Sequence, residues 1–174
     1  MTILLLCNHF PPVVDGVGDY TYRLANALAD LGLTVHVICR KQNPVAFATN
    51  FTVHPVIQNW GLSGIRSVLT VIRAVKPGWV GLQYVPYAFQ RRGLPFFLPD
   101  FLQQIRQTGA RVWVMFHEVH IRFWGIKSTI IGVLQRRIAR RLCQAAHSVT
   151  TSSDFYRELL AGFHPGIRVI PVGA

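Results

Sequence analysis

His117 and Glu118 are the residues whose types and position best suit them to chemistry, because they directly follow the apolar stretch 111–116. If that stretch is a buried strand of a parallel sheet, both side chains lie beyond its carboxyl end, where open sheets of this kind bind ligands. An imidazole changes its charge near neutral pH, and its ring nitrogens form hydrogen bonds readily. A lone histidine can also be purely structural, and so can Glu118, so both roles stay open. We interpret His120 as an ordinary loop residue.

A second candidate site is the loop after the apolar stretch 2–7. It carries Gly16, Val17 and Gly18 and leads directly into a segment of helical periodicity, whose free amides and positive dipole end would attract a phosphate. Thr21 stands where the dinucleotide-binding pattern GxGxxG requires its last glycine, and the P-loop lysine is missing too. A nicotinamide dehydrogenase and a P-loop kinase are therefore disfavoured. The two glycines can also be simple turn residues, and we expect Asp19 to cap the helix.

An aromatic and basic segment follows the apolar stretch 79–83. Its members are Tyr84, Tyr87, Phe89, Arg91 and Arg92. The segment predicts either a platform on which a substrate binds or a packed surface loop.

Four arginines gather on one side of a helix expected over residues 127–145. They are Arg136, Arg137, Arg140 and Arg141. The simplest interpretation is a helix face exposed to solvent. Alternatively, the arginines bind an anionic membrane surface or nucleic acid. Nucleic acid is the weakest of these, because no helix-turn-helix, RNP or zinc-finger pattern accompanies the charge.

Composition narrows the class of protein and of partner. The chain has 174 residues, of which 51% are hydrophobic and 14% charged, which excludes intrinsic disorder, collagen and coiled coil. Its 18 Lys and Arg against 7 Asp and Glu give a net charge of +11, which favours anionic partners: lipid, phosphate or nucleic acid.

Targeting signals and cysteines point to the cytoplasm. The N-terminal apolar run 3–7 is too short for a signal peptide, and polar residues interrupt every apolar segment before it reaches the length of a membrane span. Cys7, Cys39 and Cys143 form no CxxC pair and lie in or beside apolar segments. We expect them to be buried free thiols in a reducing cytoplasm.

Short apolar runs alternate with helical segments along the whole chain, which is typical of a doubly wound, mainly parallel α/β sheet with helices on both faces. The expected strands are 2–7, 34–39, 52–57, 79–83, 111–116, 148–151 and 168–170. The expected helices are 18–31, a segment through residues 65–75 that Pro77 stops, 94 or 99 to 108, 127–145, and a short one to Leu160 capped by Ser153. Residues 1–174 are predicted to be one Rossmann-like domain, and the end of the chain looks like a domain boundary.

Several motifs resemble, in order and spacing, the N-terminal half of GT-B glycosyltransferases of family 4. They are residues 10–20 (FPPVVDGVGDY), the helix and strand at 24–37, and the segments 83–87 (QYVPY), 116–118 (FHE), 149–153 (VTTSS) and 169–173 (VIPVG). The chain departs from the family at Leu33, where the family often has histidine. The resemblance spans nearly the whole sequence.

The resemblance implies an acceptor-binding domain that works with a separate donor-binding domain, in cis or in trans. The whole enzyme would transfer a sugar with retention from a nucleotide-diphosphate sugar, without a metal or other cofactor; accordingly the sequence has no DxD motif and no zinc-like histidine pattern. In the family, the histidine matching His117 reaches the donor sugar, and Glu118 would orient the acceptor or His117. Gly16, Val17 and Gly18 would meet the donor diphosphate. The residues expected to bind the acceptor are Asp15, Tyr84, Tyr87, Arg91 and Arg92.

Two other functions stay open. The chain could be a non-catalytic Rossmann-like module that binds anionic lipid or a partner protein, and it could associate peripherally with the inner face of a membrane. A nucleotide-cofactor domain is poorly supported because the glycine pattern fails.

Overall fold

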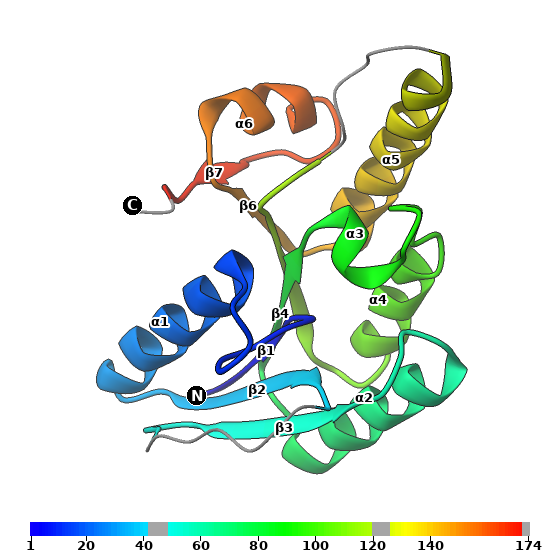
Figure 1. Cartoon of the computed structure of the whole chain (residues 1–174). Helices are drawn as coiled ribbons and strands as arrows, with labels where there is room; N and C mark the ends of the chain where they lie inside the picture. Colours follow the sequence, from blue (N-terminus) through cyan, green and yellow to red (C-terminus); the bar gives the residue numbers. More distant parts are fainter. Residues whose placement is uncertain (42–48, 120–125, 172–174) are drawn as a thin grey trace. The chain divides into compact units, whose positions relative to one another are not determined.

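The computed structural model describes residues 1–41, 49–119 and 126–171. Within these ranges the chain forms a seven-stranded parallel sheet in the order β3-β2-β1-β4-β5-β6-β7 (Figure 1). The strands are β1 Thr2–Leu6, β2 Thr34–Arg40, β3 Thr52–Ile57, β4 Trp79–Tyr84, β5 Arg111–Phe116, β6 Ser148–Thr151 and β7 Arg168–Val169. The predicted class, a doubly wound, mainly parallel α/β sheet, is confirmed.

The chain divides into two compact units. One comprises Met1–Gln83 with Ile105–Arg111, and the other comprises Tyr84–Gln104 with Val112–Ala174. We call them the first and the second unit and describe each by itself. That residues 1–174 form a single domain stays a prediction.

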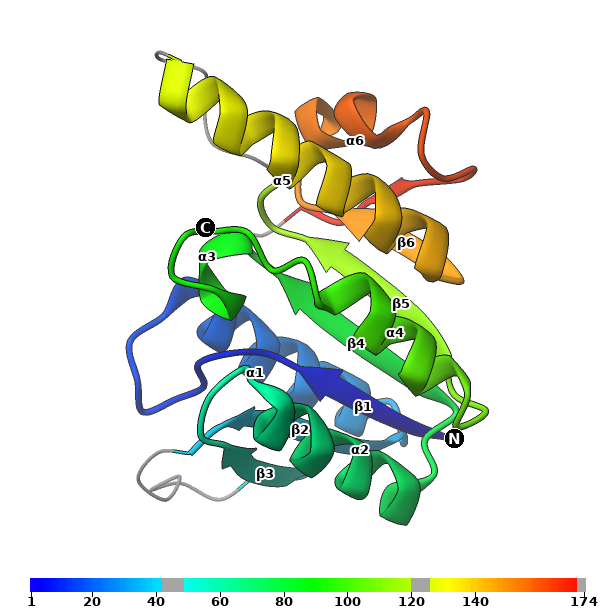
Figure 2. The ribbon, with the colours of Figure 1, turned by 90° about the vertical axis from the view of Figure 1, so that its right-hand side faces the viewer.

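In the first unit, β1 lies between β2 and β4, and both of these strands run parallel to it. Leu4, Leu5 and Leu6 are fully buried, as expected of a strand covered on both faces. The helices α1 (Gly16–Asp30) and α2 (Leu62–Val75) lie on opposite faces of these strands (Figure 2). The helix α2 buries Val68, Leu69 and Ile72, which share one face at helical spacing.

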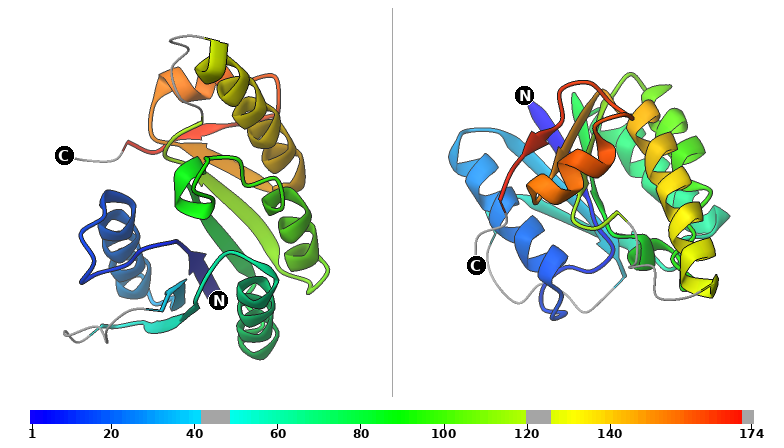
Figure 3. Two further views of the ribbon diagram at one scale, coloured as in Figure 1. Left: turned by 45° about the vertical axis from the view of Figure 1, so that its right-hand side comes forward. Right: turned by 90° about the horizontal axis from the view of Figure 1, so that it is seen from above.

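In the second unit, β6 pairs with both β5 and β7 in parallel. The helices that belong to it, wholly or in large part, are α3 (Pro86–Phe89), α4 (Leu98–Arg106), α5 (Ile126–Ala145) and α6 (Asp154–Leu160). The helix α6 packs against β6 and β7 and also contacts α5 (Figure 3). Ser153 caps α6 as predicted, because its Oγ accepts a hydrogen bond from the backbone N–H of Tyr156.

Cys7, Cys39 and Cys143 are all buried free thiols, as predicted. Burial raises the pKa of Cys39 and of Cys143 to about 12, so both stay protonated and inert at neutral pH. Among the helices of the described ranges, none is long and apolar enough to cross a membrane.

Candidate functional site

The loop after β1 is held at its start by hydrogen bonds and by an aromatic cluster. The backbone N–H of Arg40 donates to the carbonyl oxygen of Asn8 at 2.9 Å, and the indole N–H of Trp60 donates to Asn8 Oδ1 at 2.8 Å. Two residues further on, the buried ring of Phe10 meets the rings of Tyr22 and Phe51 edge to face, each with 6.1 Å between centroids. The beginning of the predicted phosphate loop therefore has a defined path.

Asp15, rather than Asp19, caps the helix that follows. The Asp15 Oδ1 accepts a hydrogen bond of 2.7 Å from the backbone N–H of Gly18, and the helix begins at Gly16. The predicted cap at Asp19 is wrong because that residue already lies in the first helical turn, where its charge can only favour the helix dipole. The carboxylate of Asp15 thus uses one of the amides assigned to phosphate. A bound phosphate would rely on the amides of Gly16 and Val17.

Gly18 and Gly16 differ in what surrounds them. A Cβ atom on Gly18 would lie 2.9 Å from the backbone oxygen of His9, which is closer than real side chains allow. A Cβ on Gly16 would meet nothing within 4 Å. Gly18 is therefore needed for the close approach of α1 to its own loop, whereas the structure itself does not require glycine at position 16.

In the second unit, the main chain of His117 is fixed at the carboxyl ends of neighbouring strands. Its backbone N–H donates to the carbonyl oxygen of Tyr84, at the end of β4, at 3.1 Å. The carbonyl oxygen of Phe116 accepts hydrogen bonds from the backbone N–H of Ser152 at 3.3 Å and from Thr151 Oγ1 at 3.2 Å. His117 is half-buried and Glu118 is exposed. The structure thus places both where the sequence predicted, just beyond β5.

The side chain of Tyr84 is buried and is not accessible to a substrate. Its ring stacks on Phe89 with centroids 6.2 Å apart and meets Phe116 edge to face at 5.1 Å. Its hydroxyl is buried without a hydrogen-bond partner among the described residues, and burial raises its pKa well above the usual value. The side chain belongs to the core of the second unit, so an acceptor role for Tyr84 has no open surface to support it.

The segment after β4 is tied to α5. Gln90 Oε1 accepts a hydrogen bond from the backbone N–H of Arg92 at 2.6 Å, and the buried Gln135 on α5 donates through Nε2 to the carbonyl oxygen of Gly93 at 3.1 Å. Gly93 has a φ of +69°, and a Cβ there would lie 2.8 Å from the ring of Tyr87. This anchored turn presents Tyr87, which is 44% exposed, beside the exposed Arg91 and Arg92.

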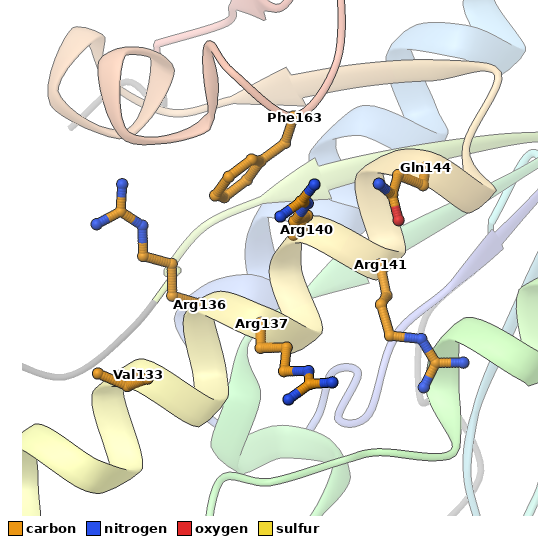
Figure 4. A pocket seen from close by; sticks show the side chains of 7 residues that line it. All are labelled: Val133, Arg136, Arg137, Arg140, Arg141, Gln144 and Phe163. Atoms are coloured by element: carbon orange, nitrogen blue, oxygen red, sulfur yellow. The ribbon is translucent and has the colours of Figure 1, made fainter.

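The four arginines of α5 line an open groove of about 720 Å³, which we call the arginine groove (Figure 4). Its lining residues are Val133, Arg136, Arg137, Arg140, Arg141, Gln144 and Phe163. The guanidinium carbons of Arg136 and Arg140 lie 5.8 and 6.0 Å from the centre of the Phe163 ring, within cation–π range. Sequence reasoning found the arginines but missed Phe163, which reaches them from the segment after α6.

The predicted site residues therefore fall into the two units. The first unit brings together Asp15, Gly16, Val17 and Gly18 at the start of α1. The second unit holds all the others, from Tyr84 through His117 to the arginine groove. The prediction that no metal is needed stays a prediction; within the described ranges, no three His, Cys, Asp or Glu side chains come together as a metal site would require. His120 lies outside the described residues.

Comparisons with known proteins point to one family. The sequence model of glycosyltransferase family 4 matches residues 14–174. A search of the curated proteins finds no match. A solved structure of sucrose-phosphate synthase from Thermosynechococcus elongatus is similar over 100% of this chain and 90% of its own, with a TM-score of 0.63 and 14% identity.

Two further structures are complexes with UDP. An alpha-glucosyltransferase bound to UDP and a 13-mer DNA is similar over 98% of this chain and 42% of its own, with a TM-score of 0.58 and 15% identity. A UGT transferase from Siraitia grosvenorii bound to UDP is similar over 99% of this chain and 50% of its own, with a TM-score of 0.57 and 11% identity. At these identities the likeness shows the shared fold. The chain spans half or less of the length of these two enzymes.

Proposed function

Because the chain belongs to glycosyltransferase family 4, we propose that it is the acceptor-side half of a retaining glycosyltransferase whose donor is a nucleotide-diphosphate sugar. The observation that carries this proposal is the family match over residues 14–174, on a Rossmann-like sheet of the kind found in GT-B enzymes. Two enzymes of similar fold were solved with UDP, which supports a nucleotide sugar as the donor class.

In this proposal His117 positions the donor sugar. Its backbone is held at the strand ends by the hydrogen bond to the carbonyl of Tyr84, and its imidazole is half-buried. A neutral imidazole would donate one N–H to a sugar hydroxyl and fix the sugar while the diphosphate leaves. The exposed carboxylate of Glu118 would accept a hydrogen bond from the incoming acceptor.

The start of α1 would meet the donor diphosphate. The amides of Gly16 and Val17 belong to the first helical turn, whose N–H groups lack partners within the helix. The carboxylate of Asp15 beside them repels a diphosphate, so phosphate binding here must be weak or must move that side chain away from Gly18. The main cationic partners of the diphosphate would therefore come from a second, donor-binding domain, in cis or in trans.

Acceptor recognition would use the anchored turn after β4. Tyr87 offers a partly exposed ring for stacking, and Arg91 and Arg92 offer hydrogen-bond donors to a polar acceptor. Tyr84 would take part only indirectly, by packing beneath this segment. The buried thiols are compatible with a cytoplasmic enzyme.

The test is a transfer assay with and without a donor-binding partner domain. We expect the 174-residue chain alone to transfer no sugar from any of a panel of nucleotide sugars, and to support transfer once combined with a donor-binding domain of the family. Transfer by this chain alone would contradict the proposed division of labour. Failure with every donor-binding domain tried, by a chain shown to be folded, would argue against the transferase function itself.

A further inference from the structure

We propose that the arginine groove binds the phosphate of a lipid headgroup, and so holds this face of the second unit at an anionic membrane surface. The shared chemistry is a phosphate group met by several guanidinium groups, and the favoured source is a phospholipid. This site is separate from the donor and acceptor roles proposed above.

Unneutralised positive charge accumulates on α5. The helix carries Lys127 and four arginines, and residues 126–145 contain no Asp or Glu. Arg136 with Arg140, and Arg137 with Arg141, stand one turn apart, where like charges repel and weaken a helix. Among the described residues, the carboxylate that pairs with this cluster is Asp100, which meets Arg141 at 2.8 Å with both side chains well exposed. A bound anion would relieve this repulsion.

Two of the four arginines are already held in place by a neighbouring ring. Figure 4 shows Arg136 and Arg140 reaching toward Phe163, while Arg137 and Arg141 lie on the other flank of the helix. The Phe163 ring lies within about 6 Å of both guanidinium carbons of the first pair, which restricts two otherwise flexible side chains. A guanidinium group can bind phosphate through two parallel N–H bonds, so restricting it lowers the cost of binding. The open groove has room for a headgroup.

Exposed apolar side chains beside the arginines favour a lipid as the source of the phosphate. Ile130 and Val133, on the turns of α5 just before the arginines, are each 56% exposed. Ile130, Val133 and Arg137 follow one another at helical spacing, so exposed apolar side chains continue directly into the cationic cluster. A helix that lies in a membrane interface has this composition, with apolar groups in the acyl boundary and cations at the phosphates. A soluble phosphate or a nucleic acid would make no use of Ile130 and Val133.

The test compares vesicle binding by the full chain and by two charge-matched variants. The probes are vesicles of phosphatidylcholine alone and of phosphatidylcholine with phosphatidylglycerol, and binding is measured by co-sedimentation. The variant R136Q/R140Q removes two charges from the arginine groove, and R66Q/R73Q removes two exposed charges from α2. We expect the groove variant to lose affinity for the anionic vesicles by about 10- to 30-fold, and the α2 variant to lose at most about threefold.

A second set of measurements separates the sources of phosphate. I130S/V133S should weaken vesicle binding while leaving any binding of pyrophosphate unchanged, and R136K/R140K should retain part of the vesicle affinity because it keeps the charge. Thermal unfolding of each variant checks that it is folded, and the single changes R136Q and R66Q replace the two double variants if R136Q/R140Q is not.

Several results would overturn the proposal. One is equal loss of vesicle binding in the groove and α2 variants, which would mean that only net charge matters. Another is binding of pyrophosphate in solution without any binding to vesicles, which would assign the groove to a soluble phosphate. A third is binding of a DNA duplex as tightly as of anionic vesicles, with the same dependence on Arg136 and Arg140.

Discussion

The backbone around Gly18 leaves no room for a side chain, so a substitution there should lower the stability of the fold. Gly18→Ala would place a methyl group 2.9 Å from the His9 carbonyl oxygen, so the loop or the helix start must shift. We expect the variant to lose about 1–3 kcal/mol of unfolding free energy, as overpacked sites do. Gly16→Ala is the matched control, because nothing lies within 4 Å of its added methyl group. It should leave stability unchanged or raise it by up to about 1 kcal/mol. Urea denaturation measures both variants, and equal effects would contradict the close contact.

Replacing His117 by alanine distinguishes a role in binding the donor sugar from a role in stabilising the fold. If its imidazole orients the donor sugar, His117→Ala in the enzyme joined to its donor-binding domain should lower kcat about 100-fold. The thermal midpoint should hardly change, since the side chain is only half-buried. A structural histidine would behave in the opposite way, with a loss of about 1–3 kcal/mol of stability and near-normal turnover per folded molecule. Measuring kcat and the midpoint on the same variant decides between them.

At the scale of elements, Gln135 connects α5 to the turn after β4. Its buried amide donates to the Gly93 carbonyl, so Gln135→Ala leaves that carbonyl unpaired and opens a cavity. We expect a loss of about 1–3 kcal/mol, together with faster amide hydrogen exchange at Arg92 and Gly93. The control is Gln144→Ala on the same helix, an exposed change that should cost less than about 0.5 kcal/mol. Unchanged exchange at residues 92–93 would show that this hydrogen bond does not hold the turn.

The neighbouring strands β2 and β3 carry a histidine pair that makes stability depend on pH. His36 Nδ1 lies 3.0 Å from His54 Nε2, and the two rings stack with centroids 5.2 Å apart. Burial lowers the pKa of His36, and burial together with the neighbouring His36 lowers the pKa of His54. As the pH falls, these two histidines take up protons in the unfolded chain at a higher pH than in the folded chain. Stability should therefore be constant above about pH 6.5 and fall as the pH drops below it. In H36Q/H54Q this fall, measured by denaturation at several pH values, should shrink; an unchanged profile would assign it to other groups.

The elements themselves were largely predictable from sequence, because continuous apolar strands and striped helices leave a clear periodicity. Contacts across long sequence distances were not. The helix α3 has only four residues, too few to show a period, and the cap at Asp15 depends on a loop path that composition does not reveal. Gln135 could have been noticed as an amide between the apolar positions Leu134 and Ile138. Nothing in the sequence places Phe163 beside Arg136, since the ring lies 27 residues away along the chain.

At the scale of the whole molecule, positive charge and donor binding can be separated by experiment. The net charge of +11 means that any anionic ligand will be attracted to the chain, including a nucleotide sugar. The proposed diphosphate loop offers only the amides of Gly16 and Val17, next to the carboxylate of Asp15. We therefore expect calorimetry of this chain with a panel of nucleotide-diphosphate sugars to give a Kd weaker than about 1 mM.

The control for that measurement is the arginine groove, which could hold the same diphosphate through its guanidinium groups. The R136Q/R140Q variant removes two of the four guanidinium groups from this contribution. Raising the ionic strength should abolish the part that Arg137 and Arg141 still make. If the weak binding disappears in this variant, the chain has no intrinsic donor site, as the division of labour between two domains requires. Micromolar binding that persists in R136Q/R140Q but is lost in a variant of the α1 loop would place the donor site on this chain instead, and would contradict that division.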